Sequence, residues 1–492
     1  MRLLYKRSLL CAFFPALACL AADPTGQMAS SAPDSNLPFV VEASGNAAAQ
    51  FPGAPRLQSF ASAQWDGKWI FISGRATGYH GVGGEESDFL RSGANDRIWV
   101  VDPTGSGPAR TYSFPLANLP DSLGPVKDQW ASTNTLFVQD GDTLYLAGGY
   151  GQNSHGEWVT YPILSTVNLP LLVGGLMQGE DLFSASISYT DSPLVQSTGG
   201  QLLKLDDGKF YLIGGHVFTG SYRAFEATDE KGSATVSQVY LGEIRKLEFQ
   251  RDPDGRLAVR LIEAYKNPDF ARRDFNAGQI ILPDGHTLGA AAYGGVFTSD
   301  QLAFTKPIYF SGAEAPRADS AFDQKMSAYT CANLLLFDPD TRTMMTTFFG
   351  GISGWMWNPD SRRFSQAPSI GNKTSPVYLD GLQWTDQITT LLRSPTATTE
   401  IVQSNRLPAN IGTNAVFLPA PELKRFRDDA PIFDLRPLRG KRVFVGYLYG
   451  GIRAYPREFP YLETSRAYNS GNVPTKTSDL IVPVYLTVPA AK

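Results

Sequence analysis

The sequence predicts an all-β protein, a β-propeller in which six four-stranded antiparallel sheets are arranged around a central axis. Three observations predict this fold. One phrase recurs along the 492 residues, namely an apolar strand, a turn, a second apolar strand and a pair of glycines. Further hairpin-like segments lie between the copies, and two hairpins make one four-stranded sheet. A single clear strand follows the last glycine pair, which leaves a place in the last sheet for an N-terminal strand.

Each copy of the phrase is expected to form the first hairpin of one blade. The Asp-Gly pair supplies the positive φ that a tight hairpin turn needs, and the flanking runs hold β-branched and aromatic residues. The glycine pair permits a bulge or a close backbone approach. The four clearest copies are AQWDGKWIFISGR (63–75), LFVQDGDTLYLAGGY (136–150), LLKLDDGKFYLIGGH (202–216) and QIILPDGHTLGAAAYGGV (279–296), and two looser copies lie in 333–352 and 415–452.

The remaining strands complete the blades and close the ring. Segments 96–114 and 244–265 each predict a second hairpin around an Asp-Pro turn. The last strand is expected in DLIVPVYLTV (479–488), and the segment LPFVVEAS (37–44) is expected to supply the missing outer strand of the same blade. Closure of this kind removes an edge that would otherwise pair with other chains. The propeller is therefore expected to span residues 37–489.

The order strand, Gly-Gly, loop, strand, Asp-Pro turn, strand resembles the kelch repeat, whose members form β-propellers. The resemblance covers about residues 38–487 and departs from the family in two ways. Ser73 and Gly74 replace the first glycine pair, and the repeats average about 75 residues, against about 50 for a kelch unit. The resemblance therefore implies a six-bladed kelch-like propeller with enlarged loops.

The N-terminus predicts an exported protein. Arg2, Lys6 and Arg7 precede the apolar run LLCAFFPALACLAA, which indicates a signal peptide over residues 1–22. Two processing routes stay open: ALAC (16–19) resembles a lipoprotein box with Cys19 as the lipidated residue, and ordinary cleavage near Ala22 is the alternative. Residues 23–36 are typical of a flexible tether. We expect an extracytoplasmic location (periplasm, outer-membrane lipoprotein or secreted), with membrane contact only through the lipid anchor.

Composition excludes several function classes. The chain has 43 Lys and Arg against 47 Asp and Glu, and it holds no basic block, so nucleic acid is not an expected partner. The sequence contains no G-x-S-x-G, H-E-x-x-H or phosphate-binding loop. Three cysteines argue against a disulfide framework, and Cys331 is expected to be a buried thiol. We expect a monomer without a cofactor.

Alternating strand direction places the loops that follow the glycine pairs on one face, which we call the Gly-Gly face. The Asp-Gly turns, including His286, belong to the opposite face, which we call the Asp-Gly face. Because the loops of the Gly-Gly face are long and rest on a rigid scaffold, binding is expected there. The candidate ligand-binding residues are Arg75, His80, Tyr150, His155, His216, Arg223 and Arg453.

Three interpretations of these residues stay open. His80, His155 and His216 could hold a metal ion, as in a metal-dependent oxidase, but no ligand spacing or galactose-oxidase-like motif supports this. The resemblance to bacterial sialic acid mutarotases, also kelch propellers, implies a sugar-acid mutarotase or epimerase, in which arginines hold a carboxylate and His216, Glu85 or Glu86 supplies acid-base catalysis. The preferred interpretation is a binding protein for a glycan or protein ligand. Whether the protein is an enzyme stays open.

Overall fold

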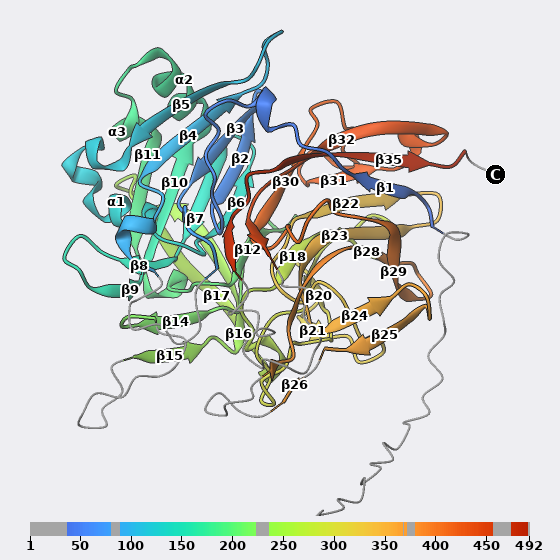
Figure 1. Cartoon of the computed structure of the whole chain (residues 1–492). Helices are drawn as coiled ribbons and strands as arrows, with labels where there is room; N and C mark the ends of the chain where they lie inside the picture. The colour runs from blue at the N-terminus through green and yellow to red at the C-terminus, as the bar shows by residue number, and fades with distance from the viewer. Residues whose placement is uncertain are drawn as a thin grey trace, which may run out of the picture. The chain divides into compact units, whose positions relative to one another are not determined.

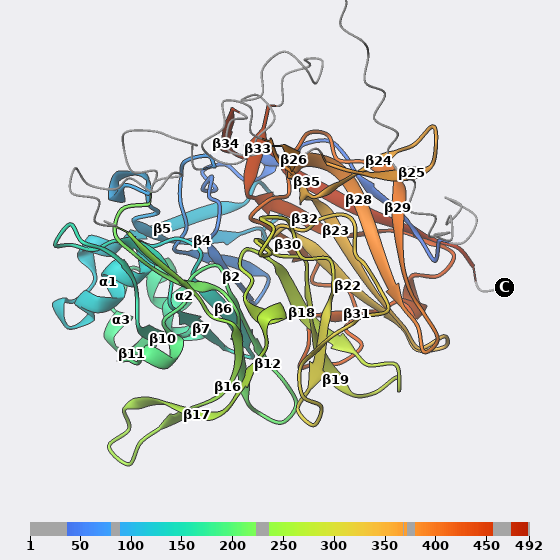
Figure 2. The same ribbon diagram turned by 90° about the horizontal axis from the view of Figure 1, so that it is seen from below.

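The computed structural model of the chain describes residues 37–79, 89–222, 236–367, 369–370, 379–455 and 474–490. Six antiparallel sheets form the six blades of a β-propeller, as the sequence predicts. In Figure 2 the first strands of the six blades surround a common centre. None of the helices within the described ranges is long and apolar enough to cross a bilayer.

Each of the first three blades is built from two successive hairpins. Blade 1 contains β2 (Ala61–Trp65), β3 (Lys68–Ile72), β4 (Arg97–Asp102) and β5 (Arg110–Pro115). Blade 2 contains β6 (Leu136–Asp140), β7 (Thr143–Ala147), β10 (Ile163–Asn168) and β11 (Ile187–Asp191). Blade 3 contains β12 (Gln201–Lys204), β13 (Phe210–Ile213), β16 (Glu243–Arg251) and β17 (Leu257–Lys266). The β16–β17 hairpin extends from its blade in Figure 2.

The last three blades are less regular. Blade 4 contains β18 (Asn276–Ile281), β19 (Leu288–Tyr293), β20 (Ile308–Ser311) and β21 (Arg317–Ala318). Blade 5 contains β22 (Asn333–Asp338), β23 (Thr343–Ser353), β28 (Gln383–Arg393) and β29 (Thr398–Arg406). Blade 6 contains β30 (Ala415–Pro419), β32 (Lys441–Gly450), β35 (Ile481–Val488) and β1 (Val40–Ala43). A fifth strand, β31 (Ile432–Asp434), pairs in parallel with β22 and comes from the β30–β32 connection.

The N-terminal strand closes the ring, as the sequence predicts. β1 is the outer strand of blade 6 and pairs antiparallel with β35, with Val40 opposite Thr487. Figure 1 shows the blue N-terminal strand beside the red C-terminal one. The two ends of the described chain therefore share one sheet, which joins the first blade to the last.

Short elements decorate the blades. The two-stranded hairpins are β8 (Tyr150–Gln152) with β9 (Trp158–Thr160), β14 (His216–Thr219) with β15 (Ser237–Tyr240), β24 (Trp355–Asn358) with β25 (Arg363–Gln366), β26 (Ser369–Ile370) with β27 (Leu379–Asp380), and β33 (Ile452–Ala454) with β34 (Thr475–Thr477). The α-helices are α1 (Gly124–Trp130), α2 (Leu169–Gln178) and α3 (Phe183–Ser186). The 3-10 turns are η1 (Ala48–Gln50), η2 (Arg91–Gly93), η3 (Leu116–Asn118), η4 (Asp121–Leu123), η5 (Pro193–Val195), η6 (Pro268–Phe270) and η7 (Arg436–Leu438).

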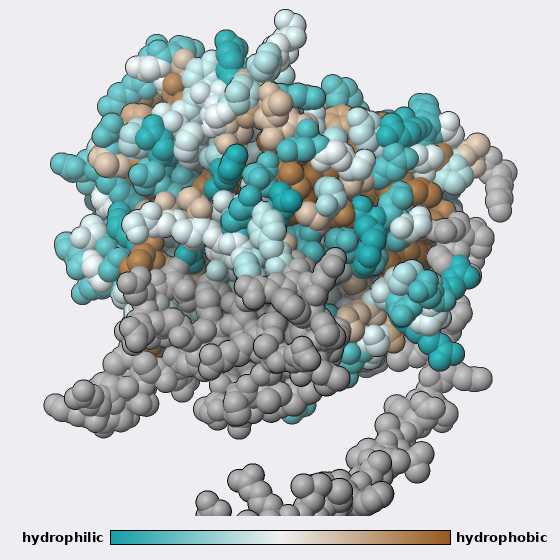
Figure 3. Space-filling model, in the orientation of Figure 1, coloured by the Kyte–Doolittle hydropathy of each residue, from teal (hydrophilic) through white to brown (hydrophobic). Residues whose placement is uncertain are grey.

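The glycine pairs allow the blades to approach closely. Gly214 has a φ of +51°, and a Cβ atom built on it would lie 2.6 Å from the carbonyl oxygen of Arg272. Ser73, which replaces glycine in blade 1, adopts the same left-handed region with a φ of +59°. The hydrophobic core lies between adjacent blades, as where Leu136 and Leu164 of blade 2 pack with Phe210 of blade 3. Hydrophilic residues cover most of the coloured surface in Figure 3.

A closed ring of backbone hydrogen bonds surrounds the axis just before the first strand of each blade. We call it the inner ring. Each residue donates its N–H to the carbonyl of its counterpart in the preceding blade, at 2.7 to 3.3 Å. Because every blade contributes one donor and one acceptor, the ring ties all six blades together. Its members are Ser59, Asn134, Gly199, Asp274, Thr330 and Asn414.

Glutamine side chains form a second set of contacts between blades. Gln64, Gln139 and Gln279 each lie five residues after an inner-ring residue, and each donates its amide to a carbonyl at the same position of the preceding blade. The three acceptors are Pro419 (3.2 Å), Gln64 (2.8 Å) and Lys204 (2.6 Å). Since these amides lie on the first strands, they fix the registration of neighbouring blades along the central axis.

Candidate functional site

Three of the predicted ligand-binding residues lie at equivalent places in blades 1 to 3. Arg75, Tyr150 and His216 each follow a glycine or glycine pair, and each forms a backbone bridge with the residue that precedes an inner-ring residue. All three are buried, with exposures of 5%, 4% and 6%. The structure thus brings these three positions together on the Gly-Gly face, where the small hairpins β8–β9 and β14–β15 lie (Figure 1). Their role in binding remains a prediction.

A buried ion pair lies beside them. Nη1 of Arg273 donates to Asp274 at 2.7 Å, and the two side chains are only 11% and 3% exposed. Nε of Arg273 donates to the hydroxyl of Tyr240 at 3.0 Å, and Tyr222 forms a further hydrogen bond with this guanidinium. Asp274 also accepts from Asn134 at 3.1 Å. We call Arg273, Asp274, Tyr222, Tyr240 and His216 the Arg273 cluster.

Burial sets the ionisation of this cluster. Burial lowers the pKa of His216 well below its usual range, and the positive charge of Arg273 lowers it further, so the imidazole is neutral near pH 7. The amide nitrogen of Gln238 lies 2.6 Å from Nδ1 of His216; with that nitrogen as donor, the ring proton lies on Nε2. Burial raises the pKa of Tyr222, which keeps its hydroxyl protonated. The cluster therefore offers neutral donors and acceptors beside the ion pair of Arg273 and Asp274.

A small void adjoins the cluster. Its volume is about 30 Å³, which is about the volume that one water molecule occupies in the liquid. Aromatic rings pack around it: Phe89 makes edge contacts with Tyr150 and Tyr222, at centroid distances of 5.6 and 5.0 Å. The void is lined by Phe89, Thr133, Asn134, Tyr150, Thr198, His216, Phe218, Tyr222, Arg273 and Tyr329.

The other predicted site residues lie elsewhere. His155 is exposed in the β8–β9 turn, where its backbone N–H donates to Asn153. Arg453 forms an ion pair with Asp479 at 2.9 Å on the β33–β34 side. His80, Arg223 and Cys19 fall outside the described residues.

The metal interpretation gains no geometric support from the histidines that the structure describes. His155 is exposed and His216 is buried, so the two do not share an environment. In the described parts of the chain, no group of three or more His, Cys, Asp or Glu side chains is placed to hold a metal ion. His286 is 80% exposed in the β18–β19 turn of the Asp-Gly face, as predicted. Cys331 is buried, also as predicted.

Arg273 and Asp274 are not among the residues that the sequence predicts for the site. They precede the first strand of blade 4, at the position that Thr133 and Asn134 occupy in blade 2. The available signal was the charged run RRD (272–274) directly before an apolar strand. The other blades have small or neutral polar residues at this position. A charged run there indicates that its side chains do more than form the turn.

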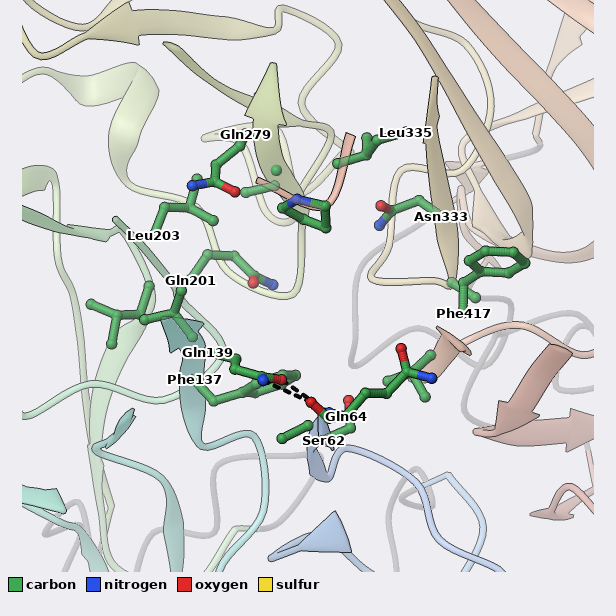
Figure 4. A pocket seen from close by; sticks show the side chains of 18 of the residues that line it. Ser62, Gln64, Phe137, Gln139, Gln201, Leu203, Gln279, Asn333, Leu335 and Phe417 are labelled. Carbon is green, nitrogen blue, oxygen red and sulfur yellow. Dashed lines mark hydrogen bonds between the residues drawn. The ribbon is translucent and has the colours of Figure 1, made fainter. Parts of the chain in front are cut away.

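A second and larger cavity follows the propeller axis. It has a volume of about 610 Å³ and is lined by the first strands of all six blades. Figure 4 shows its wall, with Gln64 and Gln139 joined by hydrogen bonds and Gln201, Gln279 and Asn333 around the opening. We call it the central channel. The sequence analysis placed no site there.

Comparison with known proteins supports no assignment of function. No protein-family model matches the chain, and no curated protein sequence matches it. Among solved structures, the chain is similar to one titled "Structure of YjhT", with 11% identity and a TM-score of 0.44 over 89% of this chain and 96% of that one. At this level of similarity the comparison carries no argument about the site.

Proposed function

We propose that this propeller is a binding protein for a carboxylate-bearing glycan, held on the Gly-Gly face with its acid group toward Arg273. The observation that carries the proposal is the buried guanidinium of Arg273 beside a small void. Burying an ion pair costs several kcal/mol of desolvation, so a pair of this kind is often retained for function.

Within the described part of the chain, the contacts of the guanidinium leave some of its donors unused. Arginine offers five N–H groups, and the contacts with Asp274, Tyr240 and Tyr222 account for three of them. Two donors of one planar fork match the two oxygens of a carboxylate. Arg273 also lines the void, which admits the end of a ligand and not a whole sugar.

The surroundings suit a sugar acid. Tyrosine hydroxyls and the neutral imidazole of His216 can exchange hydrogen bonds with sugar hydroxyls. The rings of Phe89 and Tyr150 offer apolar surface to the C–H groups at the end of the ligand that enters the void. These features favour a glycan over a protein ligand, which makes contact over a larger area.

Titration calorimetry with matched sugars tests this proposal. The panel pairs glucuronic acid and sialic acid with neutral hexoses, and the test variant combines Arg273→Gln with Asp274→Asn, which removes both charges together. We expect the acids to bind the native protein and to lose measurable affinity for this variant. The control combines Arg110→Gln with Asp102→Asn, an ion pair on the outer part of blade 1, and should bind normally. Equal affinity for acids and neutral hexoses would contradict the proposal.

A catalytic role is the second candidate, as a mutarotase or epimerase of the same sugar acid. It is favoured by the neutral imidazole of His216 beside the tyrosine hydroxyls, because ring opening moves one proton onto the ring oxygen and another off the anomeric hydroxyl. NMR exchange spectroscopy of the two anomers measures this activity. Faster exchange with the native protein, abolished by His216→Phe, would support it, and an unchanged spontaneous rate would exclude it.

We also propose that the protein is exported, on the basis of its N-terminal sequence. Arg2, Lys6 and Arg7 before an apolar run support a signal peptide, and Cys19 supports lipidation. Mass spectrometry of the protein purified from its native membrane and soluble fractions tests both. A lipid-modified N-terminal Cys19 supports the anchor, cleavage near Ala22 supports ordinary secretion, and an intact N-terminus contradicts export.

A further inference from the structure

We propose a second binding site in the central channel, for a small uncharged polyhydroxylated molecule such as a monosaccharide or a polyol. The site differs from the Arg273 cluster in place and in chemistry, and it does not depend on the function proposed above. Three features of the channel carry the inference: its size, its amide groups and its apolar wall.

The channel is large enough for such a ligand and is entered from the Asp-Gly face. A volume of about 610 Å³ falls within the range of about 300 to 1,000 Å³ that is usual for small-molecule pockets. One end is marked by the inner ring, and the void of the Arg273 cluster beyond it shares only Asn134 with the channel. The other end reaches the exposed residues Asp66, Gly141 and Asp428.

The channel wall presents side-chain amides, each of which uses one of its two N–H donors within the protein. The nitrogens of Gln64, Gln201 and Gln279 donate to Pro419, Phe275 and Lys204 of neighbouring blades. The nitrogen of Asn333 donates within its own blade, to the carbonyl of Cys331.

The amide oxygens are then left for a ligand. Among the described residues, the side-chain oxygens of Gln64, Gln201, Gln279 and Asn333 accept no hydrogen bond. They come from four different blades and line one cavity (Figure 4). Carbonyl oxygens accept hydrogen bonds and do not donate them, so the channel suits a molecule with several hydrogen-bond donors. The hydroxyl groups of a sugar or polyol are such donors.

The apolar part of the wall fits the same class of molecule. Phe137, Leu203, Leu335 and Phe417 lie between the amides around the channel (Figure 4). They offer contact to C–H groups, while the amides bind hydroxyls. This alternation is the usual composition of a small-molecule site, in which a few placed polar groups interrupt an apolar surface.

The distribution of charge argues for an uncharged ligand. The charged residues that line the channel lie at its two ends: Asp274 at the inner ring, where Arg273 pairs with it, and the others at the Asp-Gly mouth. The amide-bearing stretch between them has no charged lining residue. An ion placed there would lose its hydration without gaining a counter-charge, and that costs far more than burying hydroxyls that find acceptors.

An insertion shapes the mouth of the channel. The β30–β32 connection is long where blades 1 to 4 have tight Asp-Gly turns, and its strand β31 lies along β22 at the inner side of blade 5. Arg427 in this connection pairs with Asp429 at 2.6 Å and with Asp206 of blade 3 at 3.6 Å. The mouth is therefore bordered by a braced segment.

Saturation-transfer NMR and calorimetry with neutral hexoses, inositol and linear polyols test the proposal on the full chain. Ala277 lines the channel, so Ala277→Phe fills space and should abolish binding. Asn333→Leu keeps the branched shape of the side chain and removes its acceptor oxygen, together with the donor to Cys331, so the dissociation constant should rise about fivefold to tenfold. Asn118→Leu, at the exposed turn η3, is the control and should change nothing. Should Ala277→Phe fail to fold, Asn333→Leu still decides.

The two sites can be separated. Arg273→Gln, at a residue that does not line the channel, should leave polyol binding unchanged, and Ala277→Phe should leave sugar-acid binding unchanged. The proposal is overturned if none of these neutral compounds binds saturably, if both channel variants bind as the native protein does, or if a crystal soaked with a bound compound shows only water in the channel.

Discussion

The buried pair of Arg273 and Asp274 makes the sharpest energetic prediction. Replacing Arg273 by Gln leaves the carboxylate of Asp274, which is 3% exposed, without its guanidinium. Breaking one side of a buried pair costs about 3 to 5 kcal/mol of unfolding free energy. Asp274→Asn leaves the guanidinium with its tyrosine partners, so its cost should be toward the lower end of that range.

The combined variant removes both charges, so neither is left buried alone. We expect its loss of unfolding free energy to be smaller than the sum of the two single losses by about 2 kcal/mol or more. This coupling free energy lies in the upper part of the usual range for contacting residues. Asn also tolerates the left-handed φ of +54° at position 274. Urea denaturation of the four proteins measures the cycle. Additive single effects would refute the claim that this pair is an integrated buried unit.

Three further predictions concern the scaffold. Burial raises the pKa of Glu400 from 4.5 to about 7, so the folded state binds this proton more tightly than the unfolded state does, and about 3 kcal/mol of unfolding free energy should be lost as the pH rises from about 4.5 through 7. Urea midpoints should fall across this pH window in the native protein and change less in Glu400→Gln, and equal slopes for the two proteins would contradict the assignment. Gln279→Leu removes the donor to the carbonyl of Lys204 and should lower the unfolding free energy by about 1 to 3 kcal/mol, whereas Gln366→Leu on the exposed face of β25 should change it by no more than about 0.5 kcal/mol. Similar urea midpoints for the two variants would argue against the role of the amide. Burial raises the pKa of the Cys331 thiol to about 12, so a thiol reagent should modify it only after unfolding, and rapid modification of the native protein at pH 8 would contradict its burial.

The repeated phrase made the fold predictable because its signals are local. The Asp-Gly turns at Asp66, Asp140 and Asp284 require only a tight turn between two apolar strands, and the structure has them at those places. Closure by β1 was predictable from a strand left over at each end of the chain. The short helices were not predictable: α1, for example, begins with a Gly-Pro pair and has only 7 residues, which is too short for an apolar periodicity to show.

The site was harder to predict because its contacts join distant parts of the chain. Arg75, Tyr150 and His216 could be placed on one face by counting strands, but the partner of Asn134 is Asp274, 140 residues away. The inner ring joins backbone groups that carry no sequence signal at all. β31 pairs with β22 from a connection that the repeat pattern treats as a turn.

The most direct test of the central claim is a crystal structure of the protein soaked with the tightest-binding sugar acid. We expect the carboxylate to lie in the void on the Gly-Gly face, within hydrogen-bond distance of the Arg273 guanidinium, with the sugar ring outside the void. A carboxylate bound away from Arg273, on the outer blades or in the central channel, would contradict it.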